Sequence, residues 1–207
     1  MPKAPAELLQ TYRRDQIVNA AREAIGEHGY EHTSMDQIAK HAGLSRSTVY
    51  EYFSSKEEIL RGSFAAHREQ LGHELERCLG EASTTLERLT AFFEVCLASV
   101  DEHREYFVAV VFPLSLDEPT RADGPGGADF AGVVQHFYET VDRILDEGVA
   151  RGEFPGPVQP TDRACLGTLI VGAMGTRGRL AAAPPAHEAA AQFAHFALNG
   201  LGLSPIG

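Results

Sequence analysis

Apolar residues recur at intervals of three and four along almost the whole chain of 207 residues. This spacing places them on one side of a helix. The alternation of apolar and polar residues that is typical of a half-buried strand is missing. No two-residue turn motif of a β-hairpin lies between two apolar segments. The pattern therefore predicts an all-α fold of about nine helices.

Capping residues set the expected ends of these helices. Gly43 stands where a left-handed C-terminal cap would end the second helix. Ser34 can form a capping box with Asp36 or Gln37, and an S-x-x-E box begins at Ser55. The helices are predicted over residues 12–28, 34–42, 45–53, 55–79, 86–100, 103–112, 130–149, 162–180 and 185–201. The many Pro and Gly residues of positions 113–128 predict a mobile loop.

The second and third helices are short and are joined by a turn that contains glycine, which is a helix-turn-helix pattern. The second helix of such a pair buries one side and presents polar groups to the major groove of DNA. Its inner side is predicted to consist of Leu44, Val49 and Phe53. The sequence thus predicts an N-terminal three-helix domain over residues 1–54 and a larger helical bundle over residues 55–207.

The outer side of the third helix is polar at its start, where Arg46, Ser47 and Thr48 follow one another. Ser45 can cap the helix, but Thr48 stands where a capping box would have Glu, and no acid occupies the first turn. The positive end of the helix is therefore expected to be open to phosphates or base edges.

Four charged residues of the N-terminal part each allow two interpretations. Glu51 can accept a hydrogen bond from a cytosine amino group, or it can face solvent or pair with Lys56. Lys3, Arg13 and Arg14 can reach phosphates or the minor groove, or they can belong to a solvated face.

The formal net charge of −11 is unusual for a DNA-binding protein, but its distribution matters more than its total. Residues 1–60 contain seven basic and nine acidic residues, whereas the remaining chain contains eleven basic and twenty acidic residues. Salt screens charges beyond roughly 8–10 Å. An acidic C-terminal part is therefore compatible with DNA binding at the N-terminus, and it should limit non-specific binding.

The run HTSMDQIAKHAGLSRSTVYEYFSSKEEIL, preceded by AAREAIGEHGY, resembles the DNA-binding domain of the TetR family of transcriptional regulators over residues 12–60. The likeness includes the IA-x-x-AG turn, the S-x-x-T-V-Y start and the YF-x-x-KEE-I-L exit. It implies a regulator whose third helix contacts bases. It also implies that residues 55–207 form a helical effector-binding and dimerisation domain.

The resemblance also implies particular contacts. Arg46, Ser47 and Thr48 would contact bases or nearby phosphates. Tyr50 and Tyr52 would contact phosphates, and Lys56 would contact the DNA backbone. Aromatic packing is the alternative for both tyrosines, and Ser47 replaces a small Gly that is common in the family. The predicted DNA-binding residues are Ser34, Ser45, Arg46, Ser47, Thr48, Tyr50, Tyr52 and Lys56.

Aromatic residues on successive helices of the C-terminal part predict an apolar cavity with a few polar groups, as in small-molecule sites. A plain aromatic core is the alternative. The expected effector is a largely apolar small molecule. The candidate pocket residues are Phe92, Phe93, His103, Tyr106, Phe107, Phe137 and Tyr138.

The last two predicted helices contain CLGTLIVGAMG and HEAAAQFAHFALNG, whose small residues allow close approach between helices. Homodimers of the TetR family usually pair through a four-helix bundle, so the resemblance implies a homodimer through these helices. Packing of the same residues within one chain is the alternative.

The sequence lacks the common enzyme motifs GxGxxG, Walker loop, HExxH and GxSxG, and its nine histidines are dispersed. We therefore predict no enzymatic activity, catalytic residue, cofactor or metal. Three scattered cysteines favour a reducing compartment, the N-terminus lacks the apolar segment of a signal peptide, and no apolar run reaches the length of a membrane span. These features predict a cytoplasmic protein.

The sequence as a whole predicts a ligand-responsive DNA-binding transcriptional regulator. We expect a repressor that binds double-stranded DNA at a palindromic operator as a dimer and is released by a small molecule. The alternatives are a TetR-like regulator that acts without a small-molecule effector, and a scaffold that has lost DNA binding.

Overall fold

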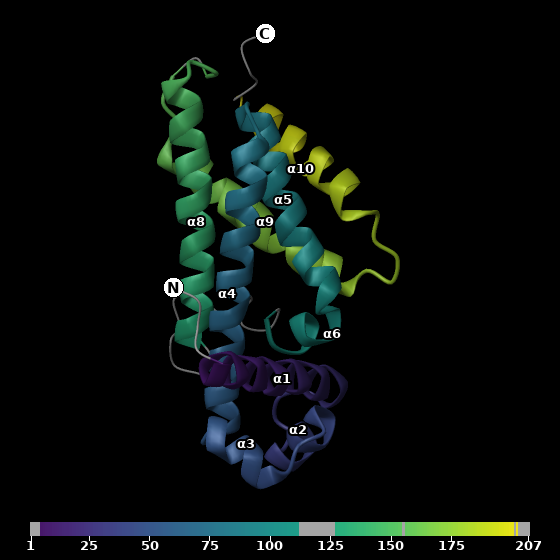
Figure 1. Cartoon of the computed structure of the whole chain (residues 1–207). Coiled ribbons are helices and arrows are strands. Elements are labelled where there is room, and N and C mark those ends of the chain that lie inside the picture. The colour runs from purple at the N-terminus through teal and green to yellow at the C-terminus, as the bar shows by residue number, and fades with distance from the viewer. Residues whose placement is uncertain (1–4, 112–126, 155, 201, 203–207) are drawn as a thin grey trace. The chain divides into compact units, whose positions relative to one another are not determined.

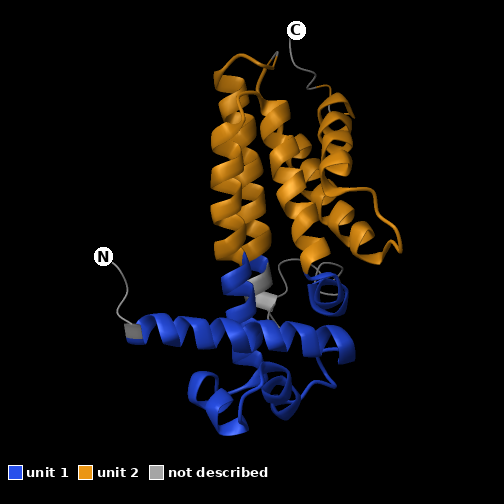
Figure 2. Cartoon of the chain, turned by 45° about the vertical axis from the view of Figure 1, so that its right-hand side comes forward, with its two compact units in different colours: residues 1–67, 103–131 blue, residues 68–102, 132–207 orange. Residues whose placement is uncertain are grey.

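The computed structural model describes residues 5–111, 127–154, 156–200 and 202. Every regular element within these residues is helical: nine α-helices and one short π-helical segment (Figure 1). The all-α fold predicted from the hydrophobic spacing is confirmed. The helices form two compact units, shown in blue and orange in Figure 2.

Unit 1 contains the N-terminal helices and a later segment that returns to them. Within it, α1 packs against α2, α3, α6 and η1, and α2 packs against α3. Its elements are α1 (Pro5–His28), α2 (Met35–Ala42), α3 (Arg46–Tyr52), the first part of α4 (Lys56–Glu81), α6 (Arg104–Tyr106) and η1 (Phe107–Val111).

Unit 2 is built from long helices with an apolar core, in which α5 packs against both α9 and α10. Phe93 of α5 stacks on Phe193 of α10 with ring centroids 5.9 Å apart. The buried Arg177 of α9 donates from Nε to Asp101 of α5 at 2.9 Å. The elements of unit 2 are the rest of α4, α5 (Thr85–Glu102), most of α8 (Gly127–Ala150), α9 (Pro160–Arg179) and α10 (Ala186–Gly200).

The first helix begins at Pro5, seven residues earlier than predicted, and this expectation was wrong. Its first turns carry the exposed Leu8, Leu9 and Tyr12. Helical spacing of buried residues reveals a helix only where one side is covered, so the exposed turns left no such signal. The helix α8 begins at Gly127, within the last residues of the predicted mobile loop, whereas residues 113–126 of that loop lie outside the described residues.

The compact units do not divide the chain at residue 54. Unit 1 extends to His67 along α4 and takes up residues 103–131, because α6 and η1 pack against α1. At this contact, a Cβ atom on Gly26 of α1 would lie 2.9 Å from the Cβ of Glu105, so glycine permits the close approach. The division into a DNA-binding and an effector-binding domain remains a prediction.

Candidate nucleic-acid interface

The turn between α2 and α3 forms as the capping residues predicted. Ser34 accepts a hydrogen bond from the backbone N–H of Gln37, whose side chain accepts one from the backbone of Ser34. Of the two residues considered for this capping box, Gln37 completes it. Gly43 ends α2 with a φ of 64°, a left-handed conformation that glycine adopts without steric cost. The capping box and Gly43 thus fix both ends of α2.

The inner side of α3 holds the helix against the rest of unit 1. Val49 and Phe53 are buried and Leu44 is half-buried, as predicted. Burial of these side chains contributes on the order of 1.5–3 kcal/mol for each fully buried one. The orientation of α3 is therefore set by its apolar side, and its polar side faces away from the core.

Two side chains of α1 hold the ends of the helix-turn-helix. Gln16 donates from Nε2 to the carbonyl of Ala42 at 2.7 Å, and Arg14 donates to the carbonyl of Tyr52 at 2.9 Å. The guanidinium of Arg14 also lies 4.2 Å from the ring centroid of Phe53. Arg14 thus positions the C-terminal end of α3, a role that the sequence analysis missed.

The N-terminal end of α3 exposes a cluster of three hydroxyl groups. Ser45 accepts a hydrogen bond from the backbone N–H of Thr48 at 3.1 Å. Its Oγ lies 2.8 Å from the hydroxyls of both Ser47 and Thr48. The first turn of α3 contains no acidic residue. This end of the helix therefore offers several donors and acceptors without a carboxylate of its own.

Arg46 extends from the same turn and is exposed. Its Nη1 donates to the carboxylate of Asp36 on α2 at 3.0 Å. Its guanidinium also lies 5.4 Å from the ring centroid of Tyr50. The hydroxyl of Tyr50, followed by the charge of Asp36, raises the pKa of Arg46, so this side chain remains cationic. Asp36 is a partner that the sequence analysis did not identify.

Lys56 is half-buried and has a structural contact of its own. Its Nζ donates to the carbonyl of Tyr30 at 2.5 Å and lies 4.2 Å from the centroid of that tyrosine ring. Glu51 is exposed and forms no ion pair with Lys56, although both belong to the described residues, so that pairing was wrong. Solvent exposure and base contact remain the two interpretations of Glu51.

The start of α4 differs from the start of α3. Glu58 donates its backbone N–H to Ser55, as the S-x-x-E motif predicted. Its carboxylate, however, accepts from the backbone and hydroxyl of Ser54, each at 2.7 Å, instead of from the backbone of Ser55. These two hydrogen bonds lower the pKa of Glu58. The beginning of α4 therefore carries its own carboxylate, whereas the beginning of α3 does not.

The predicted DNA contacts all lie at the surface of unit 1. Thr48, Tyr52 and Lys56 are half-buried, and the other five are exposed. Among the additional basic candidates, Arg13 donates to Gln16 at 2.8 Å, and Lys3 lies outside the described residues. No candidate contact is buried within the fold.

The predicted effector-pocket residues fall into two groups. His103, Tyr106 and Phe107 belong to unit 1, and the other four belong to unit 2. Phe92 contacts both Phe93 and Phe137 edge to face, with ring centroids 6.1 and 5.9 Å apart. All three phenylalanines are buried, which is the arrangement of an aromatic core.

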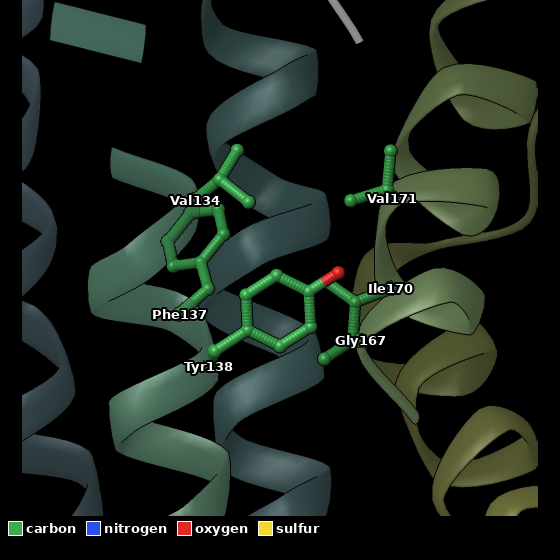
Figure 3. Close-up of a pocket in the computed structure, with 6 residues that line it drawn as sticks. All are labelled: Val134, Phe137, Tyr138, Gly167, Ile170 and Val171. Carbon is green, nitrogen blue, oxygen red and sulfur yellow. The ribbon is translucent and has the colours of Figure 1, made fainter. Parts of the chain in front are cut away.

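A small crevice between α8 and α9 includes two of the predicted residues, Phe137 and Tyr138 (Figure 3). Its cavity volume of about 10 Å³ is far below the range of drug-sized pockets. The Tyr138 ring covers Gly167, where a Cβ atom would lie only 1.7 Å from the ring. The full lining is Val134, Phe137, Tyr138, Gly167, Ile170 and Val171.

The described part of the chain contains neither a membrane-spanning helix nor a cluster of metal ligands. No helix there is both long and apolar enough to cross a membrane. Within the same residues, no group of three His, Cys, Asp or Glu side chains is placed to hold a metal ion.

Known proteins with similar sequences are regulators. Residues 17–62 match the model of the family described as bacterial regulatory proteins, tetR family. The fatty acid metabolism regulator protein of Bacillus subtilis is 29% identical over 138 residues, which cover 67% of this chain and 69% of that protein. The chain also matches BetI transcriptional regulators, such as that of Agrobacterium fabrum at 34% identity, over about half of their length.

Solved structures show the same fold over most of the chain. FadR from Bacillus subtilis, in complex with stearoyl-CoA, has a TM-score of 0.72 at 23% identity, covering 89% of this chain and 97% of that one. PfmR from Thermus thermophilus, a TetR-family regulator, has a TM-score of 0.68 at 25% identity, covering 88% of this chain and 97% of that one. These proteins are regulators and not enzymes. The helix-turn-helix segment of this chain thus matches the TetR family of transcriptional regulators, and the described helices share the fold of solved members of that family.

Proposed function

We propose that the chain is a repressor that reads a palindromic operator with the outer side of α3. The observation that carries this proposal is the exposed group formed by Ser45, Arg46, Ser47 and Thr48. These side chains offer hydroxyls and a guanidinium, the groups that contact base edges and phosphates. The opposite side of the helix is fixed by Val49 and its neighbours, so the polar groups are held in a defined orientation.

A homodimer would contact a longer stretch of DNA than one short helix can cover. Two copies spaced by about 34–36 Å would read two half-sites on one face of the duplex. The exposed side of α9 supports a dimer through the last two helices, because it carries small residues four apart: Ala164, Thr168, Gly172 and Thr176. Phe196 of α10 is 68% exposed and would be covered in such an interface.

The alternative to a dimer interface is that the small residues of the last two helices pack within one chain. The buried side of α10 supports this alternative only in part. Ala190, Ala194 and Ala197 face the core of their own unit, where α10 packs against α5. Packing within one chain therefore explains these alanines but not the exposed small residues of α9. Thr168→Arg should yield monomers by sedimentation, and Thr11→Arg, on the exposed side of α1, should leave the dimer intact. A dimer that survives Thr168→Arg would place the interface elsewhere.

The effector is proposed to be a molecule with an acyl chain. A protein of similar sequence is named for fatty acid metabolism, and a similar solved structure contains stearoyl-CoA. The crevice on α8 and α9 is lined by aliphatic and aromatic side chains together with Gly167, and its surface is apolar. An acyl chain that displaces the Tyr138 ring from Gly167 would find an apolar path between these helices.

The effector releases DNA only if it binds the DNA-incompetent conformation more tightly than the competent one. The helix α4 is the proposed lever, because it begins beside the helix-turn-helix in unit 1 and ends in unit 2. A small tilt of α4 would change the separation of the two α3 helices in the dimer and mismatch the half-sites.

Selection of bound fragments from random duplex DNA tests this function. We expect a palindrome whose half-sites are one helical turn apart, and stearoyl-CoA should release the protein from it. Recovery of fragments without shared sequence would contradict operator reading. A palindrome that stearoyl-CoA does not affect would favour a regulator without such an effector, which the small volume of the crevice also supports.

A further inference from the structure

The C-terminal ends of α1 and α2 are joined by the side chain of His41. Its Nδ1 lies 2.9 Å from the backbone carbonyl of Gln37, one turn earlier in α2. Its Nε2 lies 3.3 Å from the carboxylate of Glu27, near the end of α1. A carbonyl and a carboxylate accept hydrogen bonds and donate none. Each ring nitrogen of His41 therefore faces an acceptor.

This geometry favours the protonated ring. A neutral imidazole carries one N–H, so it donates either to Gln37 or to Glu27 and leaves its other nitrogen facing an acceptor. The imidazolium carries two N–H groups and donates to both. The hydrogen bond to the Gln37 carbonyl, followed by that to Glu27, raises the pKa of His41, although partial burial opposes this change. The cation is therefore the form of His41 that completes the contact between α1 and α2.

Two further titratable groups of α1 lie near this ring. Glu23 adds a second negative charge, which also raises the pKa of His41. The ring of His28 lies edge to face with that of His41, with centroids 6.4 Å apart, and its Nε2 is 3.6 Å from the carboxylate of Glu27. Because 3.6 Å is too long for a hydrogen bond, the carboxylate is hydrogen-bonded to His41 and not to His28.

The charges of α2 and α3 complete the surroundings of His41. Lys40 precedes it in α2 and is exposed. The charged residues of α3, which also packs against α2, are Arg46 and Glu51, and Arg46 pairs with Asp36 in the first turn of α2. Glu27 is thus the carboxylate that is hydrogen-bonded to the His41 ring.

A second histidine of unit 1, His67 of α4, responds to the fold in the opposite direction. Burial, followed by the charges of Arg22 and His103, lowers the pKa of His67 to about 4. His67 therefore stays neutral in the pH range in which His41 loses its proton. The titration of His41 can be followed without a contribution from His67.

We propose that His41 is a positioning residue for DNA reading, and that its protonated ring holds α2 against α1 through Glu27. The inference rests on the proposed function, because it adds a pH dependence to the reading of DNA by α3. His41 precedes Ala42, whose carbonyl Gln16 of α1 also holds. Only residues 43–45 separate α2 from α3, so a shift at the end of α2 is passed directly to the reading helix.

The direction of the pH dependence follows from the raised pKa of His41. Below the ordinary histidine pKa of about 6.5, the ring is protonated in every conformation and both hydrogen bonds form. As the pH rises through the higher pKa of the folded chain, the ring loses one proton and one of the two hydrogen bonds. We expect the affinity for operator DNA to fall about two- to fivefold across this range, the effect of a partly exposed ion pair.

Fluorescence anisotropy at constant ionic strength, from about pH 5.5 to about 8.5, tests the role of His41 in DNA binding. The probe is the duplex recovered by selection from random DNA. His41→Gln removes the titrating ring, and Glu27→Gln removes its partner but keeps the ring, so both variants should lose the two- to fivefold change. His28→Gln, which alters the neighbouring histidine, should keep most of it. A change that persists in Glu27→Gln would overturn the proposal, because it would arise from the charge of His41 alone. A change that disappears in His28→Gln but not in His41→Gln would overturn it as well.

The pKa of His41, measured by NMR without DNA, separates this inference from the proposed function. It should lie above the ordinary histidine value in the wild type and be lower in Glu27→Gln. Equal pKa values in the two proteins would overturn the link between α1 and α2, even if operator DNA is bound. Loss of sequence-selective binding by the wild type at every pH would instead overturn the proposed function, and the pKa comparison would still show whether the link forms.

Discussion

The guanidinium of Arg46 in α3 donates a hydrogen bond of 3.0 Å to the carboxylate of Asp36 in α2. Both side chains are more than half exposed. Exposed ion pairs contribute about 0–1 kcal/mol, so this contact gives way easily to a stronger partner. Asp36 therefore holds Arg46 in place without DNA and competes with DNA for it.

Asp36→Asn should raise the affinity for DNA. The change removes both the competing acceptor and a negative charge near the phosphates, so we expect a gain of about two- to tenfold at low salt. Fluorescence anisotropy with a labelled operator measures the affinity of both proteins for DNA. Glu74→Gln, which removes an exposed charge in unit 2, is the matched control. Equal affinities of Asp36→Asn and wild type would show that the ion pair does not limit binding.

Lys56→Ala should reduce both stability and DNA affinity. Its Nζ holds the carbonyl of Tyr30, and loss of that hydrogen bond costs about 1–3 kcal/mol in the free energy of unfolding. If Lys56 also contacts a phosphate, the slope of log affinity against log salt should fall by about 1. Denaturant unfolding and a salt series separate the two effects. An unchanged slope together with lower stability would restrict Lys56 to its structural role.

Gly167→Ala should destabilise unit 2 through the Tyr138 ring. A methyl group at this position would overlap the ring, and overpacking of this kind costs about 1–3 kcal/mol. The double variant Gly167→Ala, Tyr138→Ala should lose less stability than the sum of the two single variants, as a double-mutant cycle would show. Strict additivity would mean that the ring moves aside without cost.

His67 should make stability depend on pH in a defined window. Its pKa is about 4 in the folded chain and about 6.5 when unfolded, so the unfolded state binds the proton more readily. The free energy of unfolding should therefore fall as the pH decreases from about 6.5 to about 4, by about 3 kcal/mol, and level off below. Denaturant titrations of wild type and His67→Gln measure this difference. A wild-type curve parallel to that of the variant would contradict the lowered pKa.

The elements that carry DNA recognition were predictable because their signals are local. Ser34 and Gln37 are three residues apart, and Gly43 marks the end of α2 by its own conformational preference. The inner residues Val49 and Phe53 follow from helical spacing. Such signals fix both the boundaries of α2 and α3 and which side of α3 remains exposed.

The contacts that tune the site were not predictable because they join distant positions. Arg14 reaches Tyr52 across 38 positions, and Arg22 reaches His103 across 81. The aromatic residues on successive helices, such as Phe92, predicted either a cavity or an aromatic core, and the sequence does not distinguish the two. That distinction depends on packing between helices, which the sequence pattern does not encode.

The most direct test of DNA reading by α3 compares the sequences selected from random duplex DNA by wild type, Arg46→Ala and Thr48→Ala. Each variant is expected to lose preference at one or two positions in both half-sites, at a cost of about 1–3 kcal/mol there, while the spacing between half-sites is kept. Arg77→Ala, an exposed position on α4 in unit 2, should select the wild-type sequence. Identical base preferences for wild type, Arg46→Ala and Thr48→Ala would contradict the assignment of α3 as the reading helix.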